Sequence, residues 1–125
     1  HFYKIIKKQY KNYGVIYQHK PYFLHSSFGG QMSYDVFISG LSIAIEYQGG
    51  QHFKPIDFFF FFKRFIKQLE NDKLKQQICE ENGIKLYHFT YNKNYVKDNI
   101  DYKVYTDENE LFEVLDDIYK NNASN

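Results

Sequence analysis

The segment from Ser33 to Gln48 constrains the fold more than any other part of the sequence. It holds two runs of alternating apolar and polar residues, joined by Ser39-Gly40, a dipeptide typical of a two-residue hairpin turn. Such a turn places Asp35 opposite Ala44. Because a slip of one residue would exchange the two faces of the hairpin, the register is well specified. One face is almost wholly apolar (Tyr34, Val36, Ile38, Leu41, Ile43, Ile45, Tyr47), and the other carries Asp35, Phe37, Ser42, Ala44, Glu46 and Gln48.

Segments with helical periodicity surround the hairpin. The expected helices cover residues 2–12, 62–82 and 107–120, and the expected strands cover 33–38, 41–48 and 85–91. Residues 15–32 are ambiguous, and within them a short strand over 15–17 is one alternative. Gly83 is expected to end the second helix as a left-handed cap. Asp107 and Glu110 resemble a capping box at the start of the third helix. This order of elements predicts an α/β domain with a central mixed β-sheet flanked by helices.

Length and composition indicate one domain with an aromatic core. The 125 residues have the usual size of a single domain, and we expect one that covers residues 1–125. The 13 Tyr and 13 Phe supply much of the 43% hydrophobic content, and each aromatic side chain can bury a large area. Since the sequence begins with His1 rather than Met, one interpretation is that it is a fragment of a longer chain.

Cysteine content and hydropathy exclude several classes of protein. A single cysteine, Cys79, excludes an intramolecular disulfide and any zinc site built on cysteine pairs. No apolar run approaches the roughly 18 residues that span a bilayer, and no signal peptide is visible. We therefore expect no membrane partner and an intracellular setting.

Positive charge gathers in the first part of the sequence. The net charge is only +1, but no acid precedes Asp35. Basic side chains on the first two expected helices and beside the hairpin are candidates for contacting DNA phosphates. They are Lys7, Lys8, Lys11, Lys54, Lys63, Arg64 and Lys67. A solvated lysine-rich surface is the alternative, and charge alone does not decide between the two.

Asp35 and Glu46 form the candidate centre for chemistry. They share one face of the hairpin as diagonal neighbours about 7–8 Å apart, so their side chains can converge on one cation. Mg²⁺, or Mn²⁺ in its place, prefers carboxylate oxygens and keeps waters for a phosphate substrate. Gln48 lies on the same face and can orient a water, and His52 can move a proton near neutral pH. The alternative is the wet face of an ordinary hairpin, since exposed acids are the rule.

These residues belong to a longer string that resembles a nuclease family. Asp35, ten intervening residues and then Glu46-Tyr47-Gln48 is similar to the PD-(D/E)XK motif, with glutamine in the position usually held by lysine. The continuation Gly49-Gly50-Gln51-His52-Phe53 resembles the branch of very-short-patch-repair and phage homing endonucleases. The segment from Asn71 to Leu86 is also similar, because there an Asp-x-x-Lys helix leads through a glycine into the last core strand. The resemblance covers about residues 33–91.

The resemblance implies a restriction-endonuclease-like core and hydrolysis of DNA phosphodiester bonds. It implies Mg²⁺ as the cofactor and double-stranded DNA as the partner, in an intracellular protein of the cytoplasm or nucleoid or one encoded by a phage or virus. By position, Asp35 and Glu46 would hold the metal, Gln48 would replace the lysine, and His52 would be the acid/base. Asp72 would be an acid on the following helix, where its place on an apolar stripe also allows a structural ion pair or cap.

A second hypothesis is a non-catalytic nucleic-acid-binding or assembly domain on a decayed nuclease fold. Gln48 in place of lysine and the lack of an acid before Asp35 motivate it. The run Phe58–Phe62 adds to it, because adjacent apolar residues cannot all face a core, and exposure would favour a homodimer or another protein partner. Part of that run is expected to be a loop. A nuclease acting on RNA or branched DNA is a third hypothesis.

Overall fold

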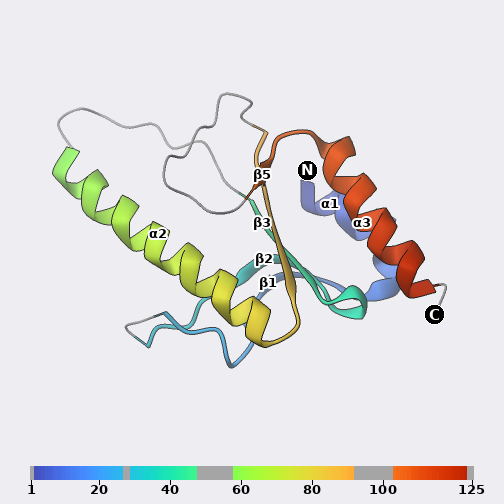
Figure 1. The fold of residues 1–125 in the computed structure, drawn as a ribbon, viewed down its shortest axis with the longest axis horizontal. Coiled ribbons are helices and arrows are strands. Elements are labelled where there is room, and N and C mark those ends of the chain that lie inside the picture. Colours follow the sequence, from blue (N-terminus) through green and yellow to red (C-terminus); the bar gives the residue numbers. More distant parts are fainter. Residues whose placement is uncertain (1, 27–28, 48–57, 92–102, 124–125) are drawn as a thin grey trace.

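The protein is built on a five-stranded mixed sheet with helices on both faces (Figure 1). The computed structural model describes residues 2–26, 29–47, 58–91 and 103–123, and it describes the backbone alone for 58–69 and 122–123. In sheet order the strands are β1 (Val15–His19), β2 (Tyr34–Ile38), β3 (Ile43–Tyr47), β4 (Lys85–Phe89) and β5 (Val104–Tyr105). The helices are α1 (Phe2–Gln9), α2 (Phe58–Glu81) and α3 (Glu108–Ala123), with short 3-10 helices η1 (Lys11–Tyr13) and η2 (Ser39–Leu41). The predicted α/β domain with a central mixed sheet is confirmed.

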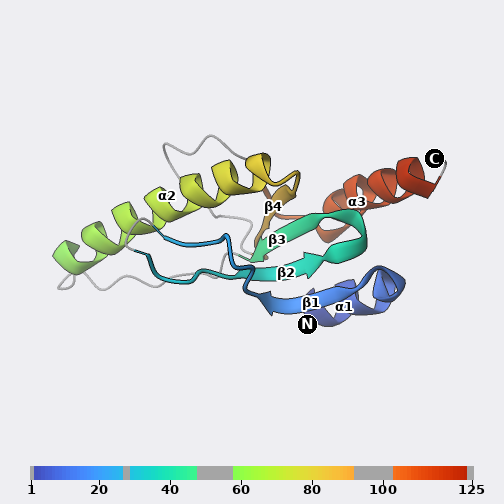
Figure 2. The same ribbon diagram turned by 90° about the horizontal axis from the view of Figure 1, so that it is seen from below.

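The sheet changes from antiparallel to parallel at β3. β1 and β3 both pair antiparallel with β2, whereas β4 and β5 extend the sheet in parallel. Parallel pairing of β3 with β4 requires a crossover connection, and α2 lies within it. The N-terminal half of α2 projects beyond the sheet, so the backbone of Phe58–Phe62 lies away from the strands (Figures 1 and 2).

The connection between β2 and β3 differs from the predicted two-residue turn. Ile38 pairs with Ile43, so the connection runs over Ser39–Ser42. Its first part is η2, and Ser42 then adopts a left-handed backbone with a φ of 53°. The Ser39 hydroxyl lies 3.1 Å from the carbonyl oxygens of Tyr13 and Gly14, to which it donates. This contact with the segment before β1 holds the turn, and local turn propensity could not indicate it.

The pairing of β2 with β3 is therefore moved by two residues. Phe37 lies opposite Ala44, where Asp35 was expected. Continuing the observed register places Asp35 opposite Glu46. Because side chains alternate with a period of two, an even shift does not exchange the two faces of the hairpin, and of the predicted apolar face only Tyr34 is found in the core on the opposite side.

The main core lies between the sheet and the helices α1 and α3. Val36, Ile38, Ile43 and Ile45 of the hairpin point into it, which confirms its predicted apolar face. Residues from both helices close this core: Phe2 and Ile6 from α1, and Leu111 and Leu115 from α3. The ring of Phe2 stacks on that of Phe89 with centroids 4.6 Å apart.

A second, smaller core lies between the opposite face of the sheet and α2. It contains Leu24, Tyr34, Ala44 and Cys79. Tyr34 was expected on the other face, but its hydroxyl accepts a hydrogen bond of 3.0 Å from the Cys79 thiol. Because α2 covers this face, the side chain of Glu46 is buried rather than solvated.

Several predicted boundaries are corrected by the structure. α2 begins at Phe58, so the expected loop within Phe58–Phe62 is wrong. The helix expected over residues 2–12 is divided into α1 and η1. β5 lies where the sequence predicts neither a helix nor a strand. It forms by pairing with β4, a tertiary contact, and two residues are too few to show a strand pattern in sequence.

The end of α2 follows its prediction, whereas the capping box predicted at the start of α3 is formed only in part: Asp107 caps the helix, but the Glu110 carboxylate bonds to Lys103. Gly83 has a φ of 68° directly after α2 and is the left-handed cap. The carboxylate of Asp107 accepts a hydrogen bond of 3.0 Å from the Asn109 N–H at the start of α3. In the described part of the chain, no helix is both long and apolar enough to cross a membrane.

A partly buried hydrogen bond joins Tyr10, which follows α1, to the last helix. The hydroxyl of Tyr10, which is 3% exposed, donates to Asp116 Oδ1 at 2.7 Å. Replacing Tyr10 with phenylalanine should lower the free energy of unfolding by about 1–2 kcal/mol, because a hydrogen bond to a charged acceptor is lost. Urea denaturation measures this change, with Tyr22→Phe as the control because Tyr22 is 85% exposed. Equal stability of Tyr10→Phe and Tyr22→Phe would contradict the prediction.

Candidate functional site

Asp35 and Glu46 lie on neighbouring strands at one end of the sheet. The continued register of β2 and β3 places them directly opposite each other, and opposed residues have Cβ atoms about 4.5–5.5 Å apart. Glu46 is 6% exposed because α2 covers it, whereas Asp35 is partly exposed. The structure thus brings the two predicted carboxylates closer together than the diagonal arrangement would.

Lys75 of α2 forms an ion pair with Glu46. Its Nζ lies 2.6 Å from Glu46 Oε1 and donates a second hydrogen bond of 2.9 Å to the carbonyl oxygen of Ser33. The side chains of Lys75 and Glu46 are 16% and 8% exposed, so little water screens their attraction. The ammonium group of Lys75 therefore lies beside the two carboxylates and is held there by two hydrogen bonds.

The surroundings of Glu46 raise its pKa from 4.5 to about 8. Burial is the largest cause, because it disfavours the charged form. The charge of Lys75 acts in the opposite direction, and the carboxylate of Asp35 adds to the increase. Because Glu46 must be ionised to bind a cation, binding there would release a proton near neutral pH.

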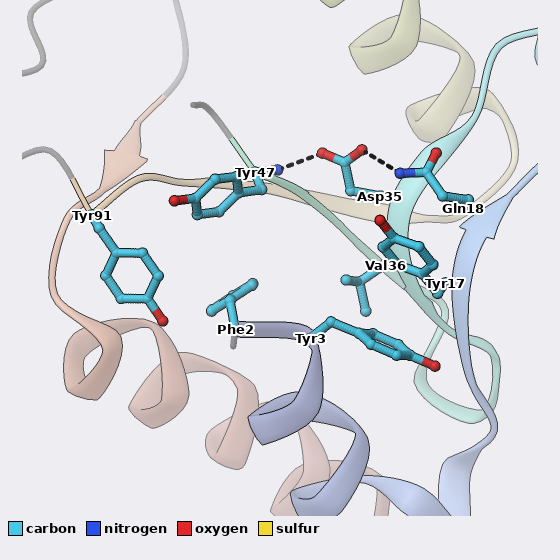
Figure 3. A pocket seen from close by; sticks show the side chains of 8 residues that line it. All are labelled: Phe2, Tyr3, Tyr17, Gln18, Asp35, Val36, Tyr47 and Tyr91. Carbon is cyan, nitrogen blue, oxygen red and sulfur yellow. Dashed lines mark hydrogen bonds between the residues drawn. The ribbon is translucent and has the colours of Figure 1, made fainter. Parts of the chain in front are cut away.

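Asp35 is oriented from both sides by neighbouring strands. Its Oδ2 accepts a hydrogen bond of 2.7 Å from the backbone N–H of Tyr47, and its Oδ1 lies 3.4 Å from the side-chain amide of Gln18 (Figure 3). The second contact is long, so Oδ1 keeps the capacity to bind another group. Gln18 is held in turn by the Ser33 hydroxyl, which donates to Gln18 Oε1 at 3.0 Å.

A pocket of about 410 Å³ opens beside Asp35. Figure 3 shows Tyr47 and Tyr91 on one side of it and Tyr3 and Tyr17 on the other. Phe2 lies between the two pairs. The pocket thus has aromatic walls and a carboxylate at its edge.

Two further ionisable side chains are buried on the elements next to Glu46, one on α2 and one on β4. Asp72 is 8% exposed and precedes Lys75 on α2 by three residues, so both side chains lie on the same side of the helix. This confirms that Asp72 lies on the buried stripe of its helix. His88 is 1% exposed and is the partner of Glu46 in the register of β3 and β4.

Some of the predicted site residues are not among the residues that the structure describes. Gln48, His52 and Lys54 lie outside the described residues. Lys63, Arg64 and Lys67 lie on the helical backbone of α2, and their side chains are outside the description.

The predicted basic residues of the first helical segment are all exposed: Lys7, Lys8 and Lys11. Nζ of Lys7 lies 5.9 Å from the ring centroid of Tyr3, which lines the pocket. Lys11 is in η1, which precedes β1 at the end of the sheet where β2 turns into β3. The fold therefore brings Lys7 toward the pocket and Lys11 toward the opposite end of the strands.

Lys75, His88 and Gln18 join the site without having been predicted as site residues. The spacing of Asp72 and Lys75 by three residues was the signal for Lys75, because it places both on one side of a helix. His88 could be paired with Glu46 only once the register of β3 and β4 was known. Gln18 has a φ of 52°, a left-handed backbone inside a strand that no sequence pattern indicates.

The donor chemistry of Asp35 and Glu46 fits a hard divalent cation. Mg²⁺ prefers oxygen ligands and is often held by only one or two carboxylates, with waters completing its shell. In the ranges that the structure describes, no group of three or more His, Cys, Asp or Glu is placed to hold a metal. Asp35 and Glu46 together offer the two carboxylates that such an ion needs from the protein.

Comparisons with known proteins identify a viral protein of similar sequence. No protein-family model matches the chain, and no solved structure matches it. The chain is similar to uncharacterized protein 033L of Invertebrate iridescent virus 3, with 34% identity over 74 residues that make up 58% of this chain. Those residues are 38% of the viral protein, so the chain spans well under half of its length.

Proposed function

We propose that the protein is a metal-dependent endonuclease that hydrolyses phosphodiester bonds in DNA. The observation that carries the proposal is that three ionisable side chains lie together at one end of the sheet. Asp35 and Glu46 oppose each other on β2 and β3, and Lys75 from α2 bonds to Glu46 at 2.6 Å. Two carboxylates and a lysine suit phosphodiester chemistry, in which a cation is held and negative charge on phosphorus is stabilised.

The order of elements supports a restriction-endonuclease-like core. The chain runs helix, three strands, helix and strand from α1 to β4, with an antiparallel hairpin followed by a parallel strand across α2. The residues that carry the resemblance, Asp35 and Glu46, lie on the two strands of that hairpin. The assignment of the fold to a restriction-endonuclease-like core is therefore part of the proposal.

Asp35 and Glu46 would hold Mg²⁺ or Mn²⁺. When bound, such an ion supplies positive charge that stabilises the phosphate and lowers the pKa of water. Lys75 supplies, from α2, the ammonium group that the amide of Gln48 cannot supply. His52 remains the proposed acid/base by resemblance, and Asp72 is proposed to orient Lys75 from the same side of α2.

The proposed partner is double-stranded DNA. The exposed lysines of α1, which has no acid in its first turn, would contact phosphates on the side of the pocket. A viral source is part of the proposal, supported by the viral relative. Association of the protein through Phe58–Phe62 remains a prediction.

Cleavage of supercoiled plasmid tests the proposal. The chain with Mg²⁺ or Mn²⁺ should convert the plasmid to nicked and linear forms, and excess chelator should stop the conversion. Intact plasmid with every divalent metal tried, at a protein concentration that binds the DNA, would contradict the proposal.

The alternative function is a nucleic-acid-binding domain that has lost catalysis. The contact of Lys75 with Glu46 favours it, because Lys75 Nζ already occupies the side-chain oxygen Oε1 that a metal would need. Under this alternative the protein binds DNA with a strong dependence on salt, and calorimetry detects no binding of Mn²⁺. Under the proposed function calorimetry detects Mn²⁺ binding, which is lost in Asp35→Asn.

A further inference from the structure

We infer that the aromatic pocket beside Asp35 receives one unpaired nucleobase of the DNA. The inference rests on the proposed function for the choice of a nucleic-acid ligand. It goes further by naming the class of substrate, which is DNA with an unpaired nucleotide at the bond to be cut. Bulged, flapped or single-stranded ends belong to this class, and a perfect duplex is bound and cut less readily because one of its bases must first unpair.

The walls of the pocket suit a flat aromatic ligand. Tyr3 and Tyr17 lie with ring centroids 4.8 Å apart on one side, and Tyr47 and Tyr91 with centroids 5.9 Å apart on the other (Figure 3). Tyr17 is 56% exposed and Tyr47 is 41% exposed, so their rings remain open to a ligand. Stacking on such rings tolerates any base, since every base has a π face. The volume of about 410 Å³ lies within the range of small-molecule pockets, roughly 300–1,000 Å³.

Gln18 places a polar side chain at the edge of the pocket, and its backbone adopts an unfavourable left-handed conformation to do so. Its φ of 52° is one that residues other than glycine rarely adopt, and such strain clusters at functional sites. The side-chain amide lies at the pocket wall, between Ser33 and Asp35. An amide both donates and accepts hydrogen bonds, so it can bind the edge of more than one base.

Charge and position favour a base of a nucleic acid over another flat ligand. Lys7 lies beside Tyr3 at the pocket, and α1 carries lysines without acids, which suits a ligand joined to phosphates. Asp35 belongs both to the pocket wall and to the pair of carboxylates with Glu46. A nucleotide with its base in the pocket therefore has its phosphate close to the proposed site of cleavage.

Binding of three fluorescein-labelled duplexes of the same sequence tests the inference. The first carries one bulged thymidine, the second an abasic residue at the bulge, and the third is a perfect duplex. Fluorescence anisotropy is measured with chelator present, so that cleavage plays no part. The chain should bind the bulged thymidine about tenfold more tightly than the abasic bulge, because the base is the only difference between them.

Matched variants locate the effect in the pocket. Tyr17→Leu and Tyr47→Leu should abolish the preference for the base, whereas Tyr17→Phe and Tyr47→Phe should keep it, because phenylalanine retains the stacking surface. Tyr22→Leu should also keep it, since Tyr22 is 85% exposed and does not line the pocket. Equal affinities of the unmodified chain for the two bulges, or the same loss in Tyr22→Leu as in Tyr17→Leu, would overturn the inference.

This test separates the pocket from the nuclease proposal. A preference for the base in a protein that never cuts plasmid would support the pocket and reject the nuclease. Cleavage of plasmid by a protein that treats the two bulges alike would reject the pocket and support the nuclease.

Discussion

Replacing Glu46 with glutamine is expected to lower the rate of Mg²⁺-dependent plasmid cleavage by at least about a hundredfold. Glutamine keeps the size of the side chain and a carbonyl oxygen, but it removes the negative charge proposed to hold the cation. Since Glu46 is buried, solvent cannot replace that charge. The measurement is the initial rate of nicking at saturating metal.

Glu110→Gln provides the matched control for this change. Glu110 also pairs with a lysine, at 2.5 Å from Lys103, but its side chain is 49% exposed and lies on α3. This variant should cut plasmid at the unmodified rate. Circular dichroism spectra of both variants should match that of the unmodified protein. A folded Glu46→Gln protein that cuts at the unmodified rate would show that Glu46 does not take part in catalysis.

Replacing Lys75 with methionine is expected to destabilise the protein by roughly 3–5 kcal/mol once Glu46 is ionised, because a buried carboxylate then lacks its partner. The loss should depend on pH. The pKa of Glu46, about 8 in the folded protein, exceeds its ordinary value of 4.5. The carboxyl group therefore contributes stability that is present below pH 4.5 and is lost as the pH rises toward 8.

Lys75 lowers the pKa of Glu46, so its removal should raise that pKa further. The variant therefore continues to lose stability as the pH rises above 8. At pH 6.5 Glu46 holds a proton with or without Lys75, so the variant should lose only about 1–2 kcal/mol. Urea denaturation at pH 6.5 and pH 9.5 measures the difference.

Two further variants check that Glu46 is the cause of this dependence. The double variant Lys75→Met with Glu46→Gln should lose the dependence on pH, since no buried acid remains at that position. Lys103→Met should have almost no effect on stability at either pH, because exposed ion pairs contribute little. An effect of Lys75→Met that is the same at both pH values would contradict the assignment of a buried, coupled pair.

The hairpin shows how much of the site was predictable from sequence. Alternation of apolar and polar residues assigned Asp35 and Glu46 to one face, and the observed register keeps them there. The turn was predicted incorrectly because Ser39 is held by the backbone of Tyr13 and Gly14. An even shift of register moved Asp35 along the strand without moving it to the other face.

The rest of the site depends on contacts between distant segments. Lys75 reaches Glu46 across 29 positions in sequence, and this contact exists only because α2 packs over β3. The burial that raises the pKa of Glu46 has the same origin. The pocket likewise combines α1, β1, β2, β3 and the end of β4, so no single motif could indicate it.

Diffraction from crystals grown with Mn²⁺ tests the central claim most directly, because the anomalous signal locates the ion without reference to activity. One ion is predicted within about 2.0–2.6 Å of carboxylate oxygens from both Asp35 and Glu46. Lys75 should then be displaced from Glu46 Oε1, which it contacts at 2.6 Å without metal. An unchanged ion pair between Lys75 and Glu46 at saturating Mn²⁺, with no anomalous peak between the two carboxylates, would contradict the proposed function.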